Sequence, residues 1–216
     1  MTEKLKRTAL YQTHTSLGAR IIPFAGWQMP IQYTGILDES RWVRKKGGLF
    51  DVSHMGRINI EGPQAADLLD WLQSNNIGNL GMGRARYSLV CNDDGGIIDD
   101  TVTYRLGDER FLVVCNAGNR EAVLSWIDSW RNAKYPDTVI DDITFNTAMI
   151  AVQGPASAAI IDRLCPGKPS TLRYFSSLES HIEHKKVLIG RTGYTGEDGF
   201  EVITEASDGP WLWQKL

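Results

Sequence analysis

Residues 87–116 read YSLVC-NDDGG-IIDDTVTY, then RLGDER, then FLVVCN. Three apolar, β-branched runs are separated here by segments rich in Gly, Asp and Asn, the residues of tight turns. Such a pattern is typical of antiparallel strands joined by hairpins. The stretch therefore predicts a β-meander around which the rest of the chain is organised.

Two adjacent carboxylates, Asp99 and Asp100, lie inside the second run, although Asp is disfavoured in strands. Because successive strand side chains point to opposite faces, each carboxylate has its own neighbours: Ile98, Val102 and Tyr104 for Asp100, and Ile97, Thr101 and Thr103 for Asp99. We expect the more polar face of Asp99 to be the wetter one. Asp100 then stands on an apolar, aromatic face, where its charge needs a partner or a task. The alternative is a solvated Asp at a sheet edge.

Length and composition are those of a globular protein. The 216 residues can bury a sizeable core, in one large domain or two intertwined ones, and 42% are hydrophobic and 23% charged. A net charge of −3 makes nucleic acid a poor candidate partner. No apolar run approaches the roughly 18 residues that span a bilayer, so no membrane association is expected.

The N-terminus and the cysteines favour a cytoplasmic protein of bacterial type. The basic start, MTEKLKR, is not followed by an apolar signal segment and lacks the length of a transit peptide. The three cysteines, Cys91, Cys115 and Cys165, form no CxxC pair and lie in apolar surroundings. Buried thiols in a reducing compartment are the simplest interpretation.

An internal repeat is visible outside the meander. Residues 58–65 and 150–156 each read as a strand, a Gly-Pro and the start of a helix. Apolar periodicity predicts further helices over residues 38–46 and from 119 to 131. Downstream of each repeat lies a Tyr-Ser or Tyr-Phe-Ser, followed by a Gly-rich hairpin that carries acids. The repeat predicts two similar halves with a ligand cleft between them and one carboxylate from each.

The acid of the second half is Glu201, inside a predicted strand and on the face opposite Phe200. A carboxylate accepts two parallel hydrogen bonds, as a flat heterocycle with adjacent ring N–H and amino donors would offer. A surface strand Glu is the alternative. Tyr174 and Tyr194 are more often core or rim aromatics than ligand stackers.

Other motifs carry little weight. His181 and His184 resemble a metal pair, but residues 180–190 read as one strand, on which residues three apart face opposite ways. Ser53 and His54 are neighbours in sequence, which seldom reach each other's side chains, and no nucleophile elbow is present. The seven tryptophans mostly fall on helical stripes or in apolar segments and read as packing. No metal site is expected.

Four motifs carry a resemblance to a known family: FAGWQMP at 24–30, FDVSHMG at 50–56, GGIIDD at 95–100 and RTGYTGEDGFE at 191–201. Together, and in this order, they resemble the signatures of the glycine cleavage system T protein, the tetrahydrofolate-dependent aminomethyltransferase. The resemblance extends over essentially the whole chain. It implies an α+β fold of two related, intertwined folate-binding sub-domains with antiparallel sheets flanked by helices. The first sub-domain would comprise residues 1–53 and 141–216. The second would be inserted into it and would comprise residues 54–140.

The resemblance also implies roles for individual residues. Asp100 matches the catalytic carboxylate, and Glu201 matches the acid that grips the pterin edge. Six further residues match positions that line the folate pocket: Met55, Tyr87, Tyr104, Asn116, Tyr174 and Tyr194. The implied partner is the lipoylated glycine cleavage H protein, and the implied reaction passes a methylene to tetrahydrofolate and releases ammonia.

One departure from the family concerns length. Family chains continue well beyond residue 216, with more of the folate-binding region and a C-terminal barrel-like domain, whereas this sequence stops inside an apparent helix that opens at residues 208–210. Basic residues for the folate tail are expected from that missing part. The rival hypothesis is a non-catalytic folate-binding module of the same fold; the Cys motif of iron–sulfur maturation relatives is absent from residues 191–197.

Overall fold

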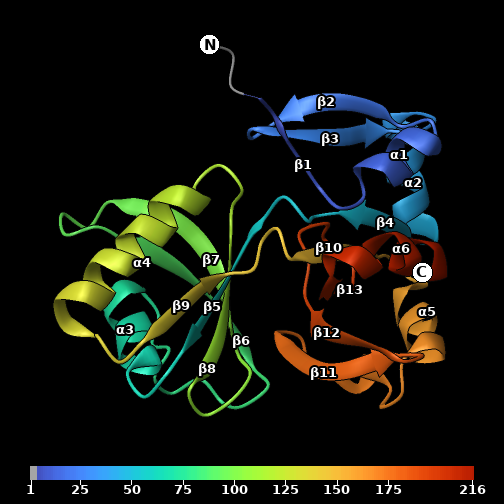
Figure 1. The fold of residues 1–216 in the computed structure, drawn as a ribbon. Coiled ribbons are helices and arrows are strands. Elements are labelled where there is room, and N and C mark those ends of the chain that lie inside the picture. The colour runs from blue at the N-terminus through green and yellow to red at the C-terminus, as the bar shows by residue number, and fades with distance from the viewer. Residues whose placement is uncertain (1–3) are drawn as a thin grey trace. The chain divides into compact units, whose positions relative to one another are not determined.

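The computed structural model describes residues 4–216, which form two compact units, coloured along the chain in Figure 1. The inserted unit comprises residues 55–144 and 175–177. The flanking unit comprises the described residues up to 54 together with residues 145–174 and 178–216. The sub-domain boundaries named above stay a prediction.

The inserted unit is a five-stranded antiparallel sheet with two helices on one face (Figure 1). Its strand order is β6-β7-β8-β5-β9, so the predicted meander is confirmed as three neighbouring strands. The elements are β5 (Gly56–Glu61), α3 (Ala65–Leu72), β6 (Ala85–Cys91), β7 (Ile97–Arg105), β8 (Arg110–Cys115), α4 (Arg120–Lys134) and β9 (Val139–Asp142). Apolar side chains of α3 and α4 pack on β5 and β8 to form one core.

The flanking unit holds a second five-stranded sheet, of order β11-β12-β13-β10-β4. Its strands are β4 (Gly48–Asp51), β10 (Thr147–Gln153), β11 (Ser176–Ile182), β12 (Lys185–Arg191) and β13 (Gly199–Glu205). The helices are α1 (Tyr11–Ser16), α2 (Ile36–Lys45), α5 (Ser157–Leu164) and α6 (Gly209–Lys215), with 3₁₀ turns η1 (Pro169–Thr171) and η2 (Ala206–Asp208). A small sheet joins β1 (Lys6–Arg7), β2 (Arg20–Phe24) and β3 (Trp27–Gln32).

The two large sheets share one topology, which confirms the internal repeat. In chain order, β5, α3, β6, β7 and β8 of the inserted unit correspond to β10, α5, β11, β12 and β13 of the flanking unit, and the strand orders match. Gly62 and Gly154 open the two turns that lead into α3 and α5, at φ 122° and 112°. Both backbones lie in a region that L side chains rarely adopt, so glycine is needed at each turn.

The two Gly-rich hairpins are not equivalent. Residues 92–96 join the first and second strands of their meander, whereas residues 192–198 join the second and third strands of theirs. Asp100 and Glu201 therefore do not occupy matching positions in the repeat, contrary to what the short sequence match suggested.

Residues 180–190 form a hairpin and not the single predicted strand. Strand β11 ends at Ile182, and Glu183 turns the chain with a left-handed φ of 53° before β12 begins at Lys185. A non-Gly residue is uncommon in this conformation. Because no glycine or proline stands at residues 180–185, the turn could not be recognised from the sequence. His181 thus lies on a strand and His184 in the turn. Within residues 4–216, no cluster of three or more His, Cys, Asp and Glu side chains is arranged to hold a metal ion.

Two other expectations need correction. Cys115 and Cys165 are buried as predicted, but Cys91 is only half-buried. Trp42 and Trp71 expose more than half of their side chains and are not core residues. No helix in the described part of the chain is both long and apolar enough to cross a bilayer.

Candidate functional site

The residues predicted in the inserted unit gather on one face of its sheet. In the ladder, Leu89 lies opposite Asp100, and Tyr87 lies opposite Val102. Continuing the ladders of β7, β8 and β5 by one residue places Asp100, Asn116 and Met55 in a single row. Tyr87 and Tyr104 share this face because they alternate in register with Asp100. All five predicted residues of this unit therefore lie on the face opposite α3 and α4.

Asp100 has defined hydrogen-bond partners but is not fully buried. The side-chain amide of Asn116 donates to Oδ1 of Asp100 at 2.8 Å and contacts its carbonyl oxygen at 3.2 Å. Partial desolvation, followed by the charge of Asp100 and a hydrogen bond to it, raises the pKa of the Tyr87 phenol. The phenol therefore stays protonated and donates to the carboxylate. Asp100 is thus held by Asn116 and Tyr87 while it remains partly exposed.

Asp99 is the more buried of the two carboxylates, so the expectation of a wetter face for it was wrong. It is only 3% exposed and accepts hydrogen bonds from the Asn116 backbone N–H at 2.8 Å and from the side-chain amides of Asn116 and Asn119 at 3.0 and 2.7 Å. The reason is that this polar face is the one covered by the helices. The threonines on it find partners inside, as Thr103 does with Gln73 at 2.9 Å.

Glu201 lies on the central strand pair of the flanking unit. It is 3% exposed, which rules out the surface-Glu alternative. Across the sheet it lies between Gly190 on β12 and Ala151 on β10, and Phe50 on β4 follows Ala151 in the same row. Both of its cross-strand neighbours, Gly190 and Ala151, are small. Phe200 and Val202, on the opposite face, belong to the helix-covered core.

The loop between β12 and β13 precedes Glu201 and carries Tyr194. Two ion pairs fix its ends: Arg191 to Asp198 at 2.6 Å, and Arg44 of α2 to Glu197 at 3.0 Å. The hydrogen bond from Arg191 raises the pKa of the guanidinium and lowers the pKa of the Asp198 carboxyl, so both remain charged. Tyr194 is 60% exposed, and the Tyr174 hydroxyl donates to the Gly193 carbonyl at 3.4 Å.

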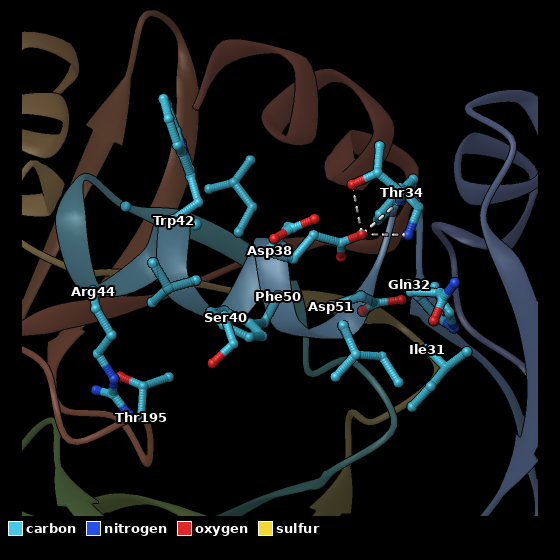
Figure 2. Close-up of a pocket in the computed structure, with 18 of the residues that line it drawn as sticks. Ile31, Gln32, Thr34, Asp38, Ser40, Trp42, Arg44, Phe50, Asp51 and Thr195 are labelled. Atoms are coloured by element: carbon cyan, nitrogen blue, oxygen red, sulfur yellow. Dashed lines mark hydrogen bonds between the residues drawn. The ribbon is translucent and has the colours of Figure 1, made fainter.

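A cavity of about 860 Å³ lies in the same unit, between α2, β3, β4 and this loop (Figure 2). Trp42, Phe50 and Tyr194 supply aromatic surface, and Arg44 and Thr195 lie at one end of it. Glu39 accepts hydrogen bonds from the backbone N–H groups of residues 33–35 at 2.6–3.0 Å and so shapes the wall.

A buried polar chain supports the wall of this cavity. The fully buried His14 contacts Asp51 through Nε2 at 3.0 Å and the Tyr33 hydroxyl through Nδ1 at 2.7 Å. Thr8 donates to the same Asp51 oxygen at 2.7 Å. Burial, and then the negative charges of Asp51 and Glu39, raise the pKa of Tyr33 to about 12. Tyr33 is therefore a hydrogen-bond donor throughout the physiological range.

The predicted residues thus fall into two groups. Asp100, Met55, Tyr87, Tyr104 and Asn116 share one face of the inserted unit, and Glu201, Tyr174 and Tyr194 lie in the flanking unit. Sequence reasoning missed three supporting residues: Asn119, which holds Asp99; His14, which holds Asp51; and Gln153, which holds the loop of Tyr194. Two of these positions can be recognised in the sequence. Asn119 immediately precedes α4, and Gln153 ends a buried strand with a side chain that can both donate and accept hydrogen bonds.

Comparisons with known proteins agree with this architecture. Residues 10–216 match the family model described as the GCVT N-terminal domain. The aminomethyltransferase of Thermotoga petrophila is 43% identical over 212 residues, which cover 98% of this chain and 58% of that protein. The aminomethyltransferase of Saccharopolyspora erythraea is 44% identical over 211 residues, with 98% and 57% coverage. The chain therefore spans less than three fifths of the length of these relatives.

Solved structures give the same result. The glycine cleavage system aminomethyltransferase T of Bartonella henselae superposes with a TM-score of 0.89 at 35% identity, covering 98% of this chain and 56% of that one. A heterotetrameric sarcosine oxidase chain from Corynebacterium sp. U-96 has a TM-score of 0.64 at 15% identity, a likeness of fold alone. By family match, identity and fold, the chain belongs to the glycine cleavage T-protein family and carries its GCVT N-terminal domain.

Proposed function

We propose that the full-length protein containing this chain is a tetrahydrofolate-dependent aminomethyltransferase of the glycine cleavage system. Its substrate would be an aminomethyl group held as a sulfur adduct on the dihydrolipoyl arm of H protein. The products would be 5,10-methylenetetrahydrofolate, ammonia and the free dihydrolipoyl thiol. Two carbon–nitrogen bonds form, one carbon–sulfur and one carbon–nitrogen bond break, and the two folate N–H protons end on sulfur and ammonia.

The single observation that carries this proposal is the placement of Asp100. Its carboxylate is hydrogen-bonded to Asn116 and Tyr87 and remains partly exposed, on a face that also holds Met55 and Tyr104. The transferred carbon develops positive charge as its bond to sulfur breaks. A fixed carboxylate stabilises such charge and can accept an amine proton. Asp99, enclosed by three amide donors, is unsuited to this role.

Glu201 is proposed to bind the pterin edge of tetrahydrofolate. The pterin presents a ring N–H beside an amino group, and a carboxylate accepts both in parallel. The burial of Glu201 supports this role, since a carboxylate held out of water makes stronger hydrogen bonds to a ligand. Tyr174 and Tyr194 are proposed to contribute to folate binding in the flanking unit, and Met55, Tyr87, Tyr104 and Asn116 in the inserted unit.

The test is ammonia release from aminomethyl-loaded H protein by the full-length protein, with and without tetrahydrofolate. We expect release to be accelerated strongly by tetrahydrofolate and to match the methylenetetrahydrofolate formed. Folate binding without any turnover would instead identify a non-catalytic folate-binding module.

Variants of β13 test the role of Glu201 separately. Glu201→Gln keeps the shape but loses the charge, so we expect tetrahydrofolate to bind about 10- to 100-fold more weakly, the range for losing charge-assisted hydrogen bonds. The control is Glu205→Gln, on the same strand but exposed, which should bind as the wild type does. Equal affinity of Glu201→Gln and Glu205→Gln would remove Glu201 from the folate site.

A further inference from the structure

Gln153 occupies an unusual place at the end of β10. Its side chain is completely buried, and in the ladder it lies directly opposite Gly199, the first residue of β13. It belongs to no apolar cluster, because it stands on the sheet face opposite the helix-covered core. The same face carries Ala151 and its cross-strand partner Glu201. Gln153 is therefore one side chain further along the face that holds Glu201.

The loop between β12 and β13 is folded around this amide. A Cβ added to Gly193 would lie 2.3 Å from Oε1 of Gln153, and one added to Gly199 would lie 2.5 Å from its Nε2. Neither glycine has a left-handed φ, unlike Gly196 in the same loop at 76°. Gly193 is thus required by the close approach of Gln153 and not by backbone conformation, and Gly199 by the close approach of both Gln153 and the Val152 carbonyl oxygen.

Both ends of the amide are used. Nε2 donates to the Thr192 carbonyl at 3.0 Å, and Oε1 accepts from the Thr195 hydroxyl at 2.7 Å. These two bonds lie on either side of Tyr194. A buried amide with both ends satisfied resists rearrangement, because moving it would leave polar atoms without partners in a dry environment. The conformation of residues 192–195 is therefore coupled to the Gln153 side chain.

We propose that Gln153 is a positioning residue for folate binding. It does not touch the ligand; it sets the path of the loop that presents Tyr194 and that leads into Glu201. This inference rests on the proposed function, since it assigns Gln153 a part in the same folate site. It places the determinant of loop shape on a strand distant in sequence from the loop itself.

The test compares two methionine variants of the full-length protein. Gln153→Met keeps the bulk but loses both hydrogen bonds. The matched control is Gln73→Met, because Gln73 is also buried and exchanges hydrogen bonds with a threonine, in the inserted unit. We expect Gln153→Met to raise the Kd for tetrahydrofolate about tenfold while the rate at saturating tetrahydrofolate stays within about threefold. Gln73→Met should lower the Tm similarly without changing the Kd.

Thr195 variants test the same contact from the other side, and they serve if Gln153→Met does not fold. Thr195→Val removes the donated hydrogen bond and should raise the Kd severalfold, whereas Thr195→Ser keeps the hydroxyl and should restore wild-type affinity. A Kd unchanged in both Gln153→Met and Thr195→Val overturns the inference and leaves the proposed function standing. A wild-type protein that binds no tetrahydrofolate overturns both.

Discussion

Asp99 and Asp100 are adjacent in sequence but have opposite environments, because strand geometry points them to opposite faces of β7. Asp99 faces the helices and is enclosed by Asn116 and Asn119. Asp100 faces away from them, and the same Asn116 amide reaches it from the side. Asn116 thus links the two carboxylates. The buried Asp99 holds the asparagine in place, and the half-buried Asp100 accepts a hydrogen bond from the same side-chain amide.

At this scale the first prediction concerns Asp100. Asp100→Asn preserves the shape and still allows contact with Asn116, so the fold and tetrahydrofolate binding should persist. The rate of ammonia release should fall by about 10²- to 10⁴-fold, the range for removing a positioned acid–base group. The exposed turn residue Asp94 gives the control, since Asp94→Asn should turn over normally. Unchanged turnover in Asp100→Asn would exclude this carboxylate from the reaction.

A second prediction concerns Asp51. Burial disfavours its ionised form, but hydrogen bonds from His14, Ser53 and Thr8 outweigh that effect and hold its pKa below the ordinary value. Because its pKa is depressed in the folded state, the Asp51 carboxylate contributes stability at pH values above its ordinary pKa of about 3.9. This stability is lost as the pH falls through the lower folded-state pKa. Asp51→Asn should therefore be less stable than wild type at pH 6, and the deficit should shrink below about pH 4.

Urea unfolding between pH 6 and pH 2.5 measures this deficit. Asp38→Asn removes an exposed carboxylate and serves as the control, with little difference from wild type at any pH. A deficit for Asp51→Asn that stays constant across the whole range would show that the Asp51 charge does not contribute.

The sequence predicted the orientation of Asp100 but not the burial of either acid. Alternation along a strand is a local property, so the face shared with Val102 and Tyr104 could be read directly. Which face the helices cover is decided by tertiary packing, and polar Thr101 and Thr103 gave a misleading signal because they find partners within the structure. Glu201 was ambiguous for the same reason, since its burial depends on neighbours such as Ala151 on a strand distant in sequence.

At the scale of elements, the strand, Gly-Pro turn and helix recur in both units with the same geometry. Gly154 lets the chain pass close to the end of α2: an added Cβ would lie 2.4 Å from the Val43 carbonyl oxygen. At Gly62 an added Cβ would lie 2.3 Å from the Asp137 carbonyl oxygen. At each of these turns the chain therefore packs directly against the backbone of a neighbouring segment.

This predicts a large and shared cost for substitution at the two turns. Gly62→Ala and Gly154→Ala combine a strained φ with a backbone clash, so each should lower the free energy of unfolding by at least about 3 kcal/mol. Gly95→Ala is the control, because Gly95 has a φ of 78° but no atom within 4 Å of an added Cβ. It should cost about 1 kcal/mol from backbone strain alone. Equal costs for all three variants in denaturant unfolding would contradict the role of close packing.

Element prediction succeeded where a turn residue or a long periodic pattern marked the boundary. The meander, the two Gly-Pro turns and the start of the helix predicted over residues 119–131 carry such marks, although that helix continues to residue 134. The hairpin at Glu183 does not, because a charged residue adopts the left-handed conformation there. Helix α2 begins two residues earlier than expected, at Ile36, where Gly35 precedes it without a side-chain cap.

At the scale of the whole molecule, the shared strand order of the two sheets indicates that each unit is a complete structural repeat. Each has its own apolar core, formed by two helices and the inner strands in the inserted unit and by α5, α6 and the inner strands in the flanking unit. The sequence revealed the repeat only through short motifs, a Gly-Pro and a Tyr-Ser or Tyr-Phe-Ser in each half, because core positions are satisfied by many apolar residues of similar size. Topology preserves the relationship better than residue identity does.

The completeness of the inserted unit predicts that it folds alone. Residues 55–144 contain all five strands of their sheet, both helices and the whole of the core around Ile58 and Phe111. The excised segment loses only residues 175–177, whose backbone pairs with Gly83 and Ala85 at one edge. We therefore expect cooperative urea unfolding and dispersed amide resonances, with the edge at residues 83–85 exchanging faster than β5 and β8. Val113→Asp, which places a charge in the fully buried core, should abolish both signals. A wild-type segment without a cooperative transition would show that its core depends on the flanking unit, so that the two repeats form one folding unit.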